Sequence, residues 1–373
     1  MRPFLEEIAS RHAFGLSMIR QLPNPDPVLK RSGKNITVYR DLLSDAHVGG
    51  CVRRRKSMVK SKKRHLFPGD SEKKVFDFVE KSLDQLDMDQ IVSEALDGAL
   101  FGYQPMEVDW QLIDGFYYPV GVYGKPAEWF CFDSDNQLRF KCQEAPLEGK
   151  LVPEGKFLLF RQDATYDNPY GIGDLSRCFW ATQFKRGGLK FWVTFAERFG
   201  SPWLVGKHPR GTPVSETDQM LSRLEDMVQD AVAVIPDDSS IDIIEASGKS
   251  NSSDLYEKLL YFCRSEISIA LLGQNQTTEA TANLASAKAG LEVSYDIASA
   301  DAKLVSAGIN ELIYWMVYYN FGDTAKPIYE IMEPEDMNLD RASRDKILYD
   351  AGVRFTKDYY RRHYGFDESD ISL

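Results

Sequence analysis

The sequence predicts an α+β protein that is mainly helical. Three observations support this class. Hydrophobic residues recur at helical spacing through most of the chain, alternating spacing is confined to about residues 104–163, and one helical pattern continues from about Leu284 to Phe321. With 373 residues, of which 43% are hydrophobic, the chain is long enough for two or three domains or one large intertwined domain.

The N-terminal part of the chain is expected to hold an arm, several helices and a small sheet. Prolines at alternate positions in LPNPDP (22–27) exclude a helix interior, so residues 1–35 are predicted to form an arm. Strand-like alternation starts at QPMEVDWQL (104–112), and the turn-separated runs that follow predict a small, mostly antiparallel sheet. Amphipathic patterns before it predict helices over 36–59, 71–86 and 88–102.

Helical spacing returns at Asp174. The stretch 174–200 is predicted to be one long helix, weakened at Gly187 and Gly188. VAVIPDDSSIDIIEA (232–246) is typical of a short hairpin. The remaining segments are predicted as a Pro- and Gly-rich connector over 201–216 and helices over 217–231 and 255–273.

An uncharged polar loop precedes the longest helix, in LLGQNQTTEATANLASAKAG (271–290). At 1.5 Å per residue the helix that follows spans roughly 55 Å, more than the diameter of a typical globular domain. Its many small residues suit either an ordinary core or the tight packing of many helices, and its length favours an assembly.

Charge is unevenly distributed in this chain of net charge −11, which is not typical of a protein that wraps nucleic acid. The segment 51–65 holds eight Lys or Arg and no acid, whereas 216–257 holds eleven acids and only two bases. The basic run allows two interpretations. Arg53, Arg54, Arg55 and Lys56 either contact phosphates, or form a solvated surface or a contact to the acidic block of a neighbouring subunit; the acidic balance of the chain favours the second.

Motifs that carry catalysis or hold a cofactor are absent from the sequence. The histidines are isolated, YGIGD (170–174) lacks the third glycine of a dinucleotide fingerprint, and no P-loop occurs. The five scattered cysteines are expected to be reduced thiols, mostly buried. The most apolar stretch, 312–321, is too short to span a bilayer, and the N-terminus is not typical of a secretory signal. We therefore expect a protein without enzymatic activity, cofactor, metal or membrane contact.

Four segments, in this order, carry a resemblance to the portal proteins of Mu-like bacteriophages and prophages. The resemblance covers roughly residues 35–365, and its most specific part is the NPYGIGDL turn with the long aromatic helix that ends in ERFGSPWLVGKHP. The segments are LDGALFGYQPMEVDW (96–110), residues 168–209, LLGQNQTTE (271–279) and SADAKLVSAGINELIYWMVYYNFG (299–322).

The resemblance implies a phage portal fold: an α/β wing, a two-helix stem with a short clip, and a long helix after a tunnel loop. Such proteins form rings, typically dodecamers, at one capsid vertex, through which double-stranded DNA is packaged and ejected. Because the chain stops at DESDISL (367–373), the C-terminal crown is expected to be short, missing or truncated. The implied parts are an arm (1–35), the wing (36–173 and 232–273), stem helices (174–200 and 217–231), the clip (201–216), the tunnel loop (274–284), the long wing helix (285–322) and the C-terminal region (323–373).

Site residues follow from this map and from the physics of a sliding surface. A conduit must face phosphates without gripping them, which suits neutral polar side chains and sparse positive charge. The predicted tunnel-loop residues are Gln274, Asn275, Gln276, Thr277, Thr278 and Asn283. The predicted stem and clip residues of the tunnel are Lys185, Arg186, Lys190, Lys207 and Arg210, with Pro202 and Trp203 as a partner-binding anchor in the clip.

The partners that the resemblance implies are further copies of the chain, double-stranded DNA, the terminase large subunit, and capsid, scaffold and head-completion proteins. The protein is then expected in the virion, and in the host bacterial cytoplasm during assembly. Two alternatives stay open: another structural phage protein, such as a tail, baseplate or connector component, and a nuclease. A nuclease requires clustered metal ligands, which the sequence does not contain.

Overall fold

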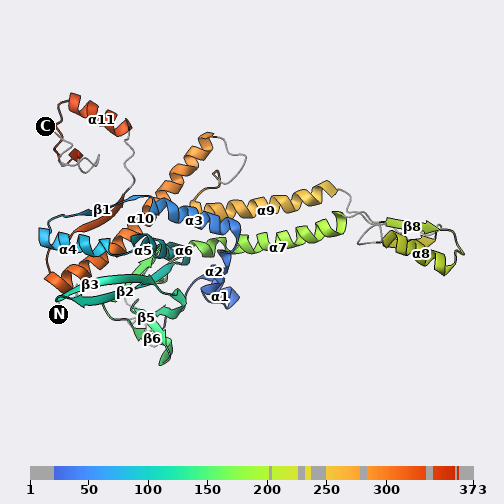
Figure 1. Cartoon of the computed structure of the whole chain (residues 1–373), viewed down its shortest axis with the longest axis horizontal. Helices are drawn as coiled ribbons and strands as arrows, with labels where there is room; N and C mark the ends of the chain where they lie inside the picture. The colour runs from blue at the N-terminus through green and yellow to red at the C-terminus, as the bar shows by residue number, and fades with distance from the viewer. Residues whose placement is uncertain are drawn as a thin grey trace. The chain divides into compact units, whose positions relative to one another are not determined.

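Two compact units make up the chain, one formed by residues 1–179 with 268–373 and the other by residues 180–267. Figure 1 shows the computed structural model with its elements labelled. No helix within its described ranges is both long and apolar enough to cross a membrane. The structure describes residues 21–200, 204–225, 232–236, 249–277, 284–332, 339–357 and 359–360.

Three antiparallel sheets lie in the first unit. The predicted strand region 104–163 forms two of them, because the 3-10 helix Ala127–Trp129, which follows Pro126, turns the chain out of one sheet and into the next. The first has the order β3 (Phe116–Gly124), β2 (Tyr103–Ile113), β7 (Phe157–Arg161), and the second β4 (Phe130–Phe132), β5 (Leu138–Cys142), β6 (Ala145–Leu151). The third joins β1 (Lys63–Phe67) to β10 (Ile328–Met332).

Two predicted helices of the first unit divide, and the segment predicted as an arm contains the short helix α1; the helix predicted over 88–102 forms α5 and α6. The predicted helix 36–59 breaks before Asp45, whose carboxylate accepts hydrogen bonds from the amides of His47 and Val48 and so caps a new helix. The helices are α1 (Pro27–Ser32), α2 (Thr37–Leu42), α3 (Ala46–Lys60), α4 (Lys73–Asp84), α5 (Met88–Ala95), α6 (Asp97–Phe101), α10 (Leu284–Phe321) and α11 (Leu339–Asp350).

Helix α10 is the centre of the core. It has the bounds that the sequence predicts, and it packs on α3, α4, β3, β7 and β10. Its buried face consists of small residues towards the N-terminal half and larger ones after Val305, which matches the space left by the surrounding elements. The buried side chains of this face are Ala298, Ala302, Val305, Ile309, Leu312, Ile313 and Met316.

Gly308 marks the closest approach between α10 and a sheet, and its replacement tests this packing. A Cβ atom there would lie 2.1 Å from Cε1 of Phe160, a fully buried residue of β7. We expect Gly308→Ala to lower the free energy of unfolding by about 1–3 kcal/mol, because the core is overpacked. Gly187 is also inside a helix, but a Cβ there meets nothing within 4 Å, so Gly187→Ala should raise stability by up to about 1 kcal/mol. Urea denaturation compares the two variants, and equal effects would contradict the packing described.

The second unit places a strand–helix–strand segment between two long helices. Strands β8 (Leu204–His208) and β9 (Val232–Pro236) pair in parallel, which requires a crossover, and α8 (Val214–Glu225) lies in that crossover. Gly206 of β8 lets α8 approach closely, since a Cβ there would lie 2.8 Å from side-chain atoms of Leu224 and Met220.

The two long helices of this unit are α7 (Asp174–Gly200) and α9 (Lys249–Leu272), and they run antiparallel and side by side (Figure 1). The ring of Phe195 lies 5.9 Å from that of Tyr256. Earlier in α7, Gly188 approaches Leu259 and Leu260, which lie later in α9. The absence of a side chain at Gly188 therefore lets the helices pack closely at this point.

Two predictions for this region extend beyond the described residues. The helix predicted over 217–231 is described up to Glu225, as part of α8, which packs on β8 and β9. The helix that lies antiparallel beside α7 is α9. Helix α9 begins with the polar residues KSNSSD, so the hydrophobic pattern did not predict its first turns. Strand β9 covers the start of the hairpin predicted over 232–246 and pairs with β8 in parallel; the rest of that segment lies outside the described residues, so the hairpin stays a prediction.

Candidate functional site

The loop after α9 is tied to α10 by one buried glutamine. Helix α9 ends at Gly273, whose backbone has the left-handed φ of 72°, and a Cβ there would lie 2.7 Å from Ile297. The side-chain amide of Gln274 donates to the hydroxyl of Thr277 at 2.5 Å and to that of Ser294 at 3.2 Å. Its carbonyl oxygen accepts from the backbone amide of Thr277 at 3.0 Å. The loop thus begins with a fixed turn.

This turn changes the role of one predicted tunnel residue. Gln274 is buried, with 5% of its surface exposed, so its side chain holds the loop and does not present a surface to DNA. The prediction that Gln274 lines a tunnel is therefore corrected. Asn275 and Thr277 are half-buried and Gln276 is exposed, so each of the three reaches the surface at least in part. Thr278 and Asn283 lie outside the described residues.

The predicted basic residues of the stem and clip all lie in the second unit, on two different parts of it. Lys185 and Arg186 are half-buried and Lys190 is exposed, all on α7. Arg186 and Lys190 are four residues apart and share a face of the helix. Lys207 lies near the C-terminal end of β8 and Arg210 lies in the turn that follows, and both are exposed. Pro202 and Trp203 lie outside the described residues.

The basic run on α3 divides into an exposed half and an internal half. Arg53 and Arg54 are exposed, whereas Arg55 is buried. The Nζ atom of Lys56 donates to Asp97 Oδ1 and to the carbonyl oxygen of Ser93, each at 2.6 Å. Burial raises the pKa of Asp97, and the charge of Lys56 partly offsets this. Arg55 and Lys56 are therefore engaged within the chain, and of the four predicted contacts to phosphates or subunits only Arg53 and Arg54 remain.

Arg55 joins four helices at one buried point. Its guanidinium donates to Asp301 of α10 from Nε at 2.7 Å and from Nη2 at 2.9 Å, and to Asp174 of α7 from Nη1 at 2.6 Å. Nη1 also lies 3.3 Å from the carbonyl oxygen of Leu271 in α9. Although burial alone would lower the pKa of Arg55, the two carboxylates outweigh it and the pKa is raised. The arginine stays charged and links the N-terminal end of α7 and the C-terminal end of α9 to the core.

A sequence signal for this burial does exist. Val48, Val52, Arg55 and Val59 recur at spacings of four, three and four residues, and all four are buried. The arginine occupies a position of the apolar stripe of α3, which a helical projection of residues 46–60 reveals. The basic run as a whole concealed it.

The cysteines differ in their access to reagents, which gives a pH-dependent prediction. Burial raises the pKa of the Cys178 thiol to about 12, whereas Cys142 on β5 is half-buried. At pH 8 we expect iodoacetamide to label Cys142 in the native protein and Cys178 only after unfolding, as mass spectrometry will show. The stability that neutral Cys178 contributes is full below its unfolded pKa of about 8.5 and is lost towards pH 12, by about 1.4 kcal/mol per pH unit. Cys178→Ala should reduce, by one proton, the slope of the free energy of unfolding against pH in this range. An unchanged slope would contradict the prediction.

Groups of three or more His, Cys, Asp or Glu side chains that could hold a metal ion do not occur among the residues that the structure describes. A serine and a histidine do meet, with Ser268 Oγ 2.8 Å from His47 Nε2. The serine is completely buried, so no substrate reaches its hydroxyl. This pair packs α3 against the end of α9 and is not arranged as a nucleophile.

Comparisons with known proteins agree on one family. The family model described as the portal protein of Mu bacteriophage matches residues 36–366. The portal protein of Escherichia phage Mu is 28% identical over 236 residues, which are 62% of this chain and 45% of that protein. Mu-like prophage FluMu protein gp29 of Haemophilus influenzae is 23% identical over 284 residues, 73% of this chain and 54% of that protein. The chain thus spans about half the length of these relatives.

Solved structures support the fold. A chain in the neck of an empty gene transfer agent particle superposes with a TM-score of 0.58 at 12% identity, covering 92% of this chain and 98% of that one. A chain in the virion of the native gene transfer agent particle gives a TM-score of 0.57, also at 12% identity, covering 89% and 93%.

Proposed function

Because this chain belongs to the family of Mu bacteriophage portal proteins, we propose that it forms a ring at a unique capsid vertex through which double-stranded DNA is packaged and ejected. Twelve copies are the number that the sequence resemblance implies. The observation that carries this proposal is the apolar surface that α7 and α9 leave uncovered in the second unit. A single copy exposes this surface to water, whereas a ring of copies covers it.

The uncovered surface consists of one stripe on each helix. On α7, Trp180, Phe184 and Phe191 are spaced by four and seven residues and so share a face; Phe184 is 58% and Phe191 64% exposed. On α9, spacings of four and three residues align Leu255, Leu259 and Phe262. The rings of Trp180 and Phe184 are stacked at 6.0 Å, so part of this surface is ordered before any neighbour binds. Rigid aromatic side chains are typical of the centres of protein interfaces.

These elements suggest a revised map of the parts. Helices α7 and α9 form the stem, and the segment between them, 201–248, forms the clip with its parallel strand pair and α8. The first unit forms the wing, crossed by α10. We propose that the clip receives the terminase large subunit during packaging and head-completion proteins later, with Pro202 and Trp203 in this segment. Capsid and scaffold proteins are the expected contacts of the wing, first in the host cytoplasm and then in the virion.

The tunnel surface is proposed to be neutral at its narrowest part. Asn275, Gln276 and Thr277, with Thr278 and Asn283, provide uncharged groups that exchange hydrogen bonds with phosphates readily. The basic residues of α7 and β8, with Arg210, are few enough to guide the phosphates without holding them. Gln274 supports this loop from within the protein.

Negative-stain imaging of the purified chain tests the proposal. We expect closed rings with an axial channel, and a label attached to Gln276→Cys should appear in that channel. Rings that carry the label on their outer rim would contradict the tunnel assignment but retain the ring. Absence of rings at any protein concentration would contradict the portal proposal and favour another structural phage component.

A further inference from the structure

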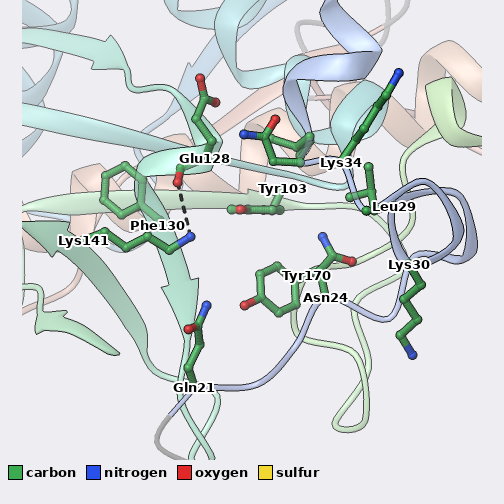
Figure 2. A pocket seen from close by; sticks show the side chains of 13 residues that line it. Gln21, Asn24, Leu29, Lys30, Lys34, Tyr103, Glu128, Phe130, Lys141 and Tyr170 are labelled. Carbon is green, nitrogen blue, oxygen red and sulfur yellow. Dashed lines mark hydrogen bonds between the residues drawn. The ribbon is translucent and has the colours of Figure 1, made fainter. Parts of the chain in front are cut away.

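A second candidate site lies in the first unit, far in sequence from the proposed tunnel. It is a cavity of about 420 Å³, within the size range of ligand pockets. One wall is the segment from Gln21 to Ile36, which includes α1, and the others come from β2, β4, β5 and the loop before α7. Figure 2 shows the side chains that line it.

The walls of this cavity are fixed by hydrogen bonds to the backbone. The amide of Leu22 donates to the carbonyl oxygen of Phe132 at 2.8 Å, so the N-terminal segment is tied to β4. The hydroxyl of Tyr170 donates to the carbonyl oxygen of Leu22 at 2.7 Å, and that of Tyr103 to Ala127 at 2.8 Å. Because both phenols already have partners, they contribute apolar ring surface to the cavity.

The charge of the cavity is positive. It is lined by Lys30, Lys34, Lys141 and one acid, Glu128. The carboxylate of Glu128 forms two hydrogen bonds with the guanidinium of Arg40, at 2.5 and 2.8 Å, so its charge is balanced. None of the three lysines forms an ion pair with any residue in the part of the chain that the structure describes.

One lysine is placed to meet a ligand. Within the described residues, Lys141 Nζ donates to the backbone carbonyl oxygen of Glu128, at 3.4 Å, and it points into the cavity in Figure 2. The amides of Gln21 and Asn24 are directed towards the same space, while Lys30 and Lys34 extend outward from the rim. Ammonium and amide donors above an aromatic floor recognise carboxylates that are joined to apolar side chains.

We propose that this cavity binds the acidic segment FDESDISL, residues 366–373 of this chain. The segment has three acids and no base, which complements three lysines, and Phe366, Ile371 and Leu373 complement the aromatic floor. It lies outside the described residues. The proposal does not depend on the ring, since the recognition involves only this cavity and this segment.

A binding assay on the full-length chain tests the proposal. In the variant Asp367→Asn/Glu368→Gln/Asp370→Asn the cavity is freed from its own segment, and we expect it to bind a fluorescein-labelled FDESDISL peptide, measured by anisotropy. The neutral peptide FNQSNISL should bind at least about tenfold more weakly. Adding Lys141→Glu to the variant should weaken the binding of the acidic peptide by a similar factor. If Lys141→Glu alters the melting curve of the protein, Lys34→Glu replaces it in the same binding assay.

The matched control is Lys150→Glu, on the neighbouring strand β6 and outside this cavity, where Lys150 pairs with the exposed Glu144. It should leave peptide binding unchanged. Three results would overturn the proposal: no saturable binding, equal binding of the acidic and neutral peptides, or displacement by inorganic phosphate as effective as by unlabelled peptide. Tighter binding of the other acidic and apolar segment, DDSSIDIIE (237–245), would also reject residues 366–373 as the occupant.

Discussion

Arg55→Ala is expected to lower the free energy of unfolding by about 3–5 kcal/mol, one of the two largest effects in this protein. The substitution removes the guanidinium that donates to both Asp301 and Asp174, so the buried carboxylate of Asp301 loses this counter-charge and Asp174 keeps only its ion pair with Arg177, at 3.2 Å, among the described residues. Uncompensated buried charge is costly because the protein interior solvates it poorly. Urea denaturation followed by circular dichroism measures the change.

Two controls separate this effect from the loss of any arginine. Arg54→Ala removes an exposed neighbour on the same helix and should change stability by no more than about 0.5 kcal/mol. The triple variant Arg55→Met/Asp174→Asn/Asp301→Asn removes all three charges and should be more stable than Arg55→Ala. If Arg55→Ala unfolds at the same urea concentration as Arg54→Ala, the buried network does not hold the helices together.

Phe184→Asp/Phe191→Asp is expected to abolish ring formation while leaving the folded chain intact. Both side chains are more than half exposed, so the substitutions should change the unfolding free energy of the single copy by no more than about 0.5 kcal/mol. In a ring, the same positions would place two carboxylates in an apolar contact, repeated in every copy. Mass photometry and negative-stain imaging detect the loss of rings.

The matched control for this interface is Leu147→Asp. Leu147 is 73% exposed on β6, in the first unit, and belongs to neither apolar stripe. It should leave ring formation unchanged, because an exposed residue outside an interface tolerates a charge. Rings that persist in Phe184→Asp/Phe191→Asp would show that another surface holds the copies together.

Local patterns in the sequence were sufficient to predict the long helices but not the pairing of strands that are far apart in the sequence. The bounds of α7 and α10 follow from continuous helical spacing, and the ends of α9 and α10 from the glycines after Leu272 and Phe321. Nothing local indicates that β8 pairs with β9 in parallel, because the crossover through α8 is a tertiary choice. The polar start of α9 likewise concealed the first turns of this helix, which was predicted only from residue 255.

The candidate sites show the same division. The polar loop after α9 was located by composition, but the burial of Gln274 depends on Ser294, twenty residues later, which composition does not reveal. The role of Arg55 could be predicted from its place in the valine stripe of α3, although its partners Asp174 and Asp301 could not. The cavity of Figure 2 joins residues from 21 to 170 and has no counterpart in any single stretch of sequence.

The antiparallel pair of β1 and β10 has a consequence for synthesis on the ribosome. Residues 63–67 find their partners only at residues 328–332. At about 5–20 residues per second, the nascent chain waits roughly 13–50 s between the emergence of one strand and the other. The β1–β10 sheet therefore closes only after residue 332 has emerged, and a polypeptide released before that point lacks this sheet.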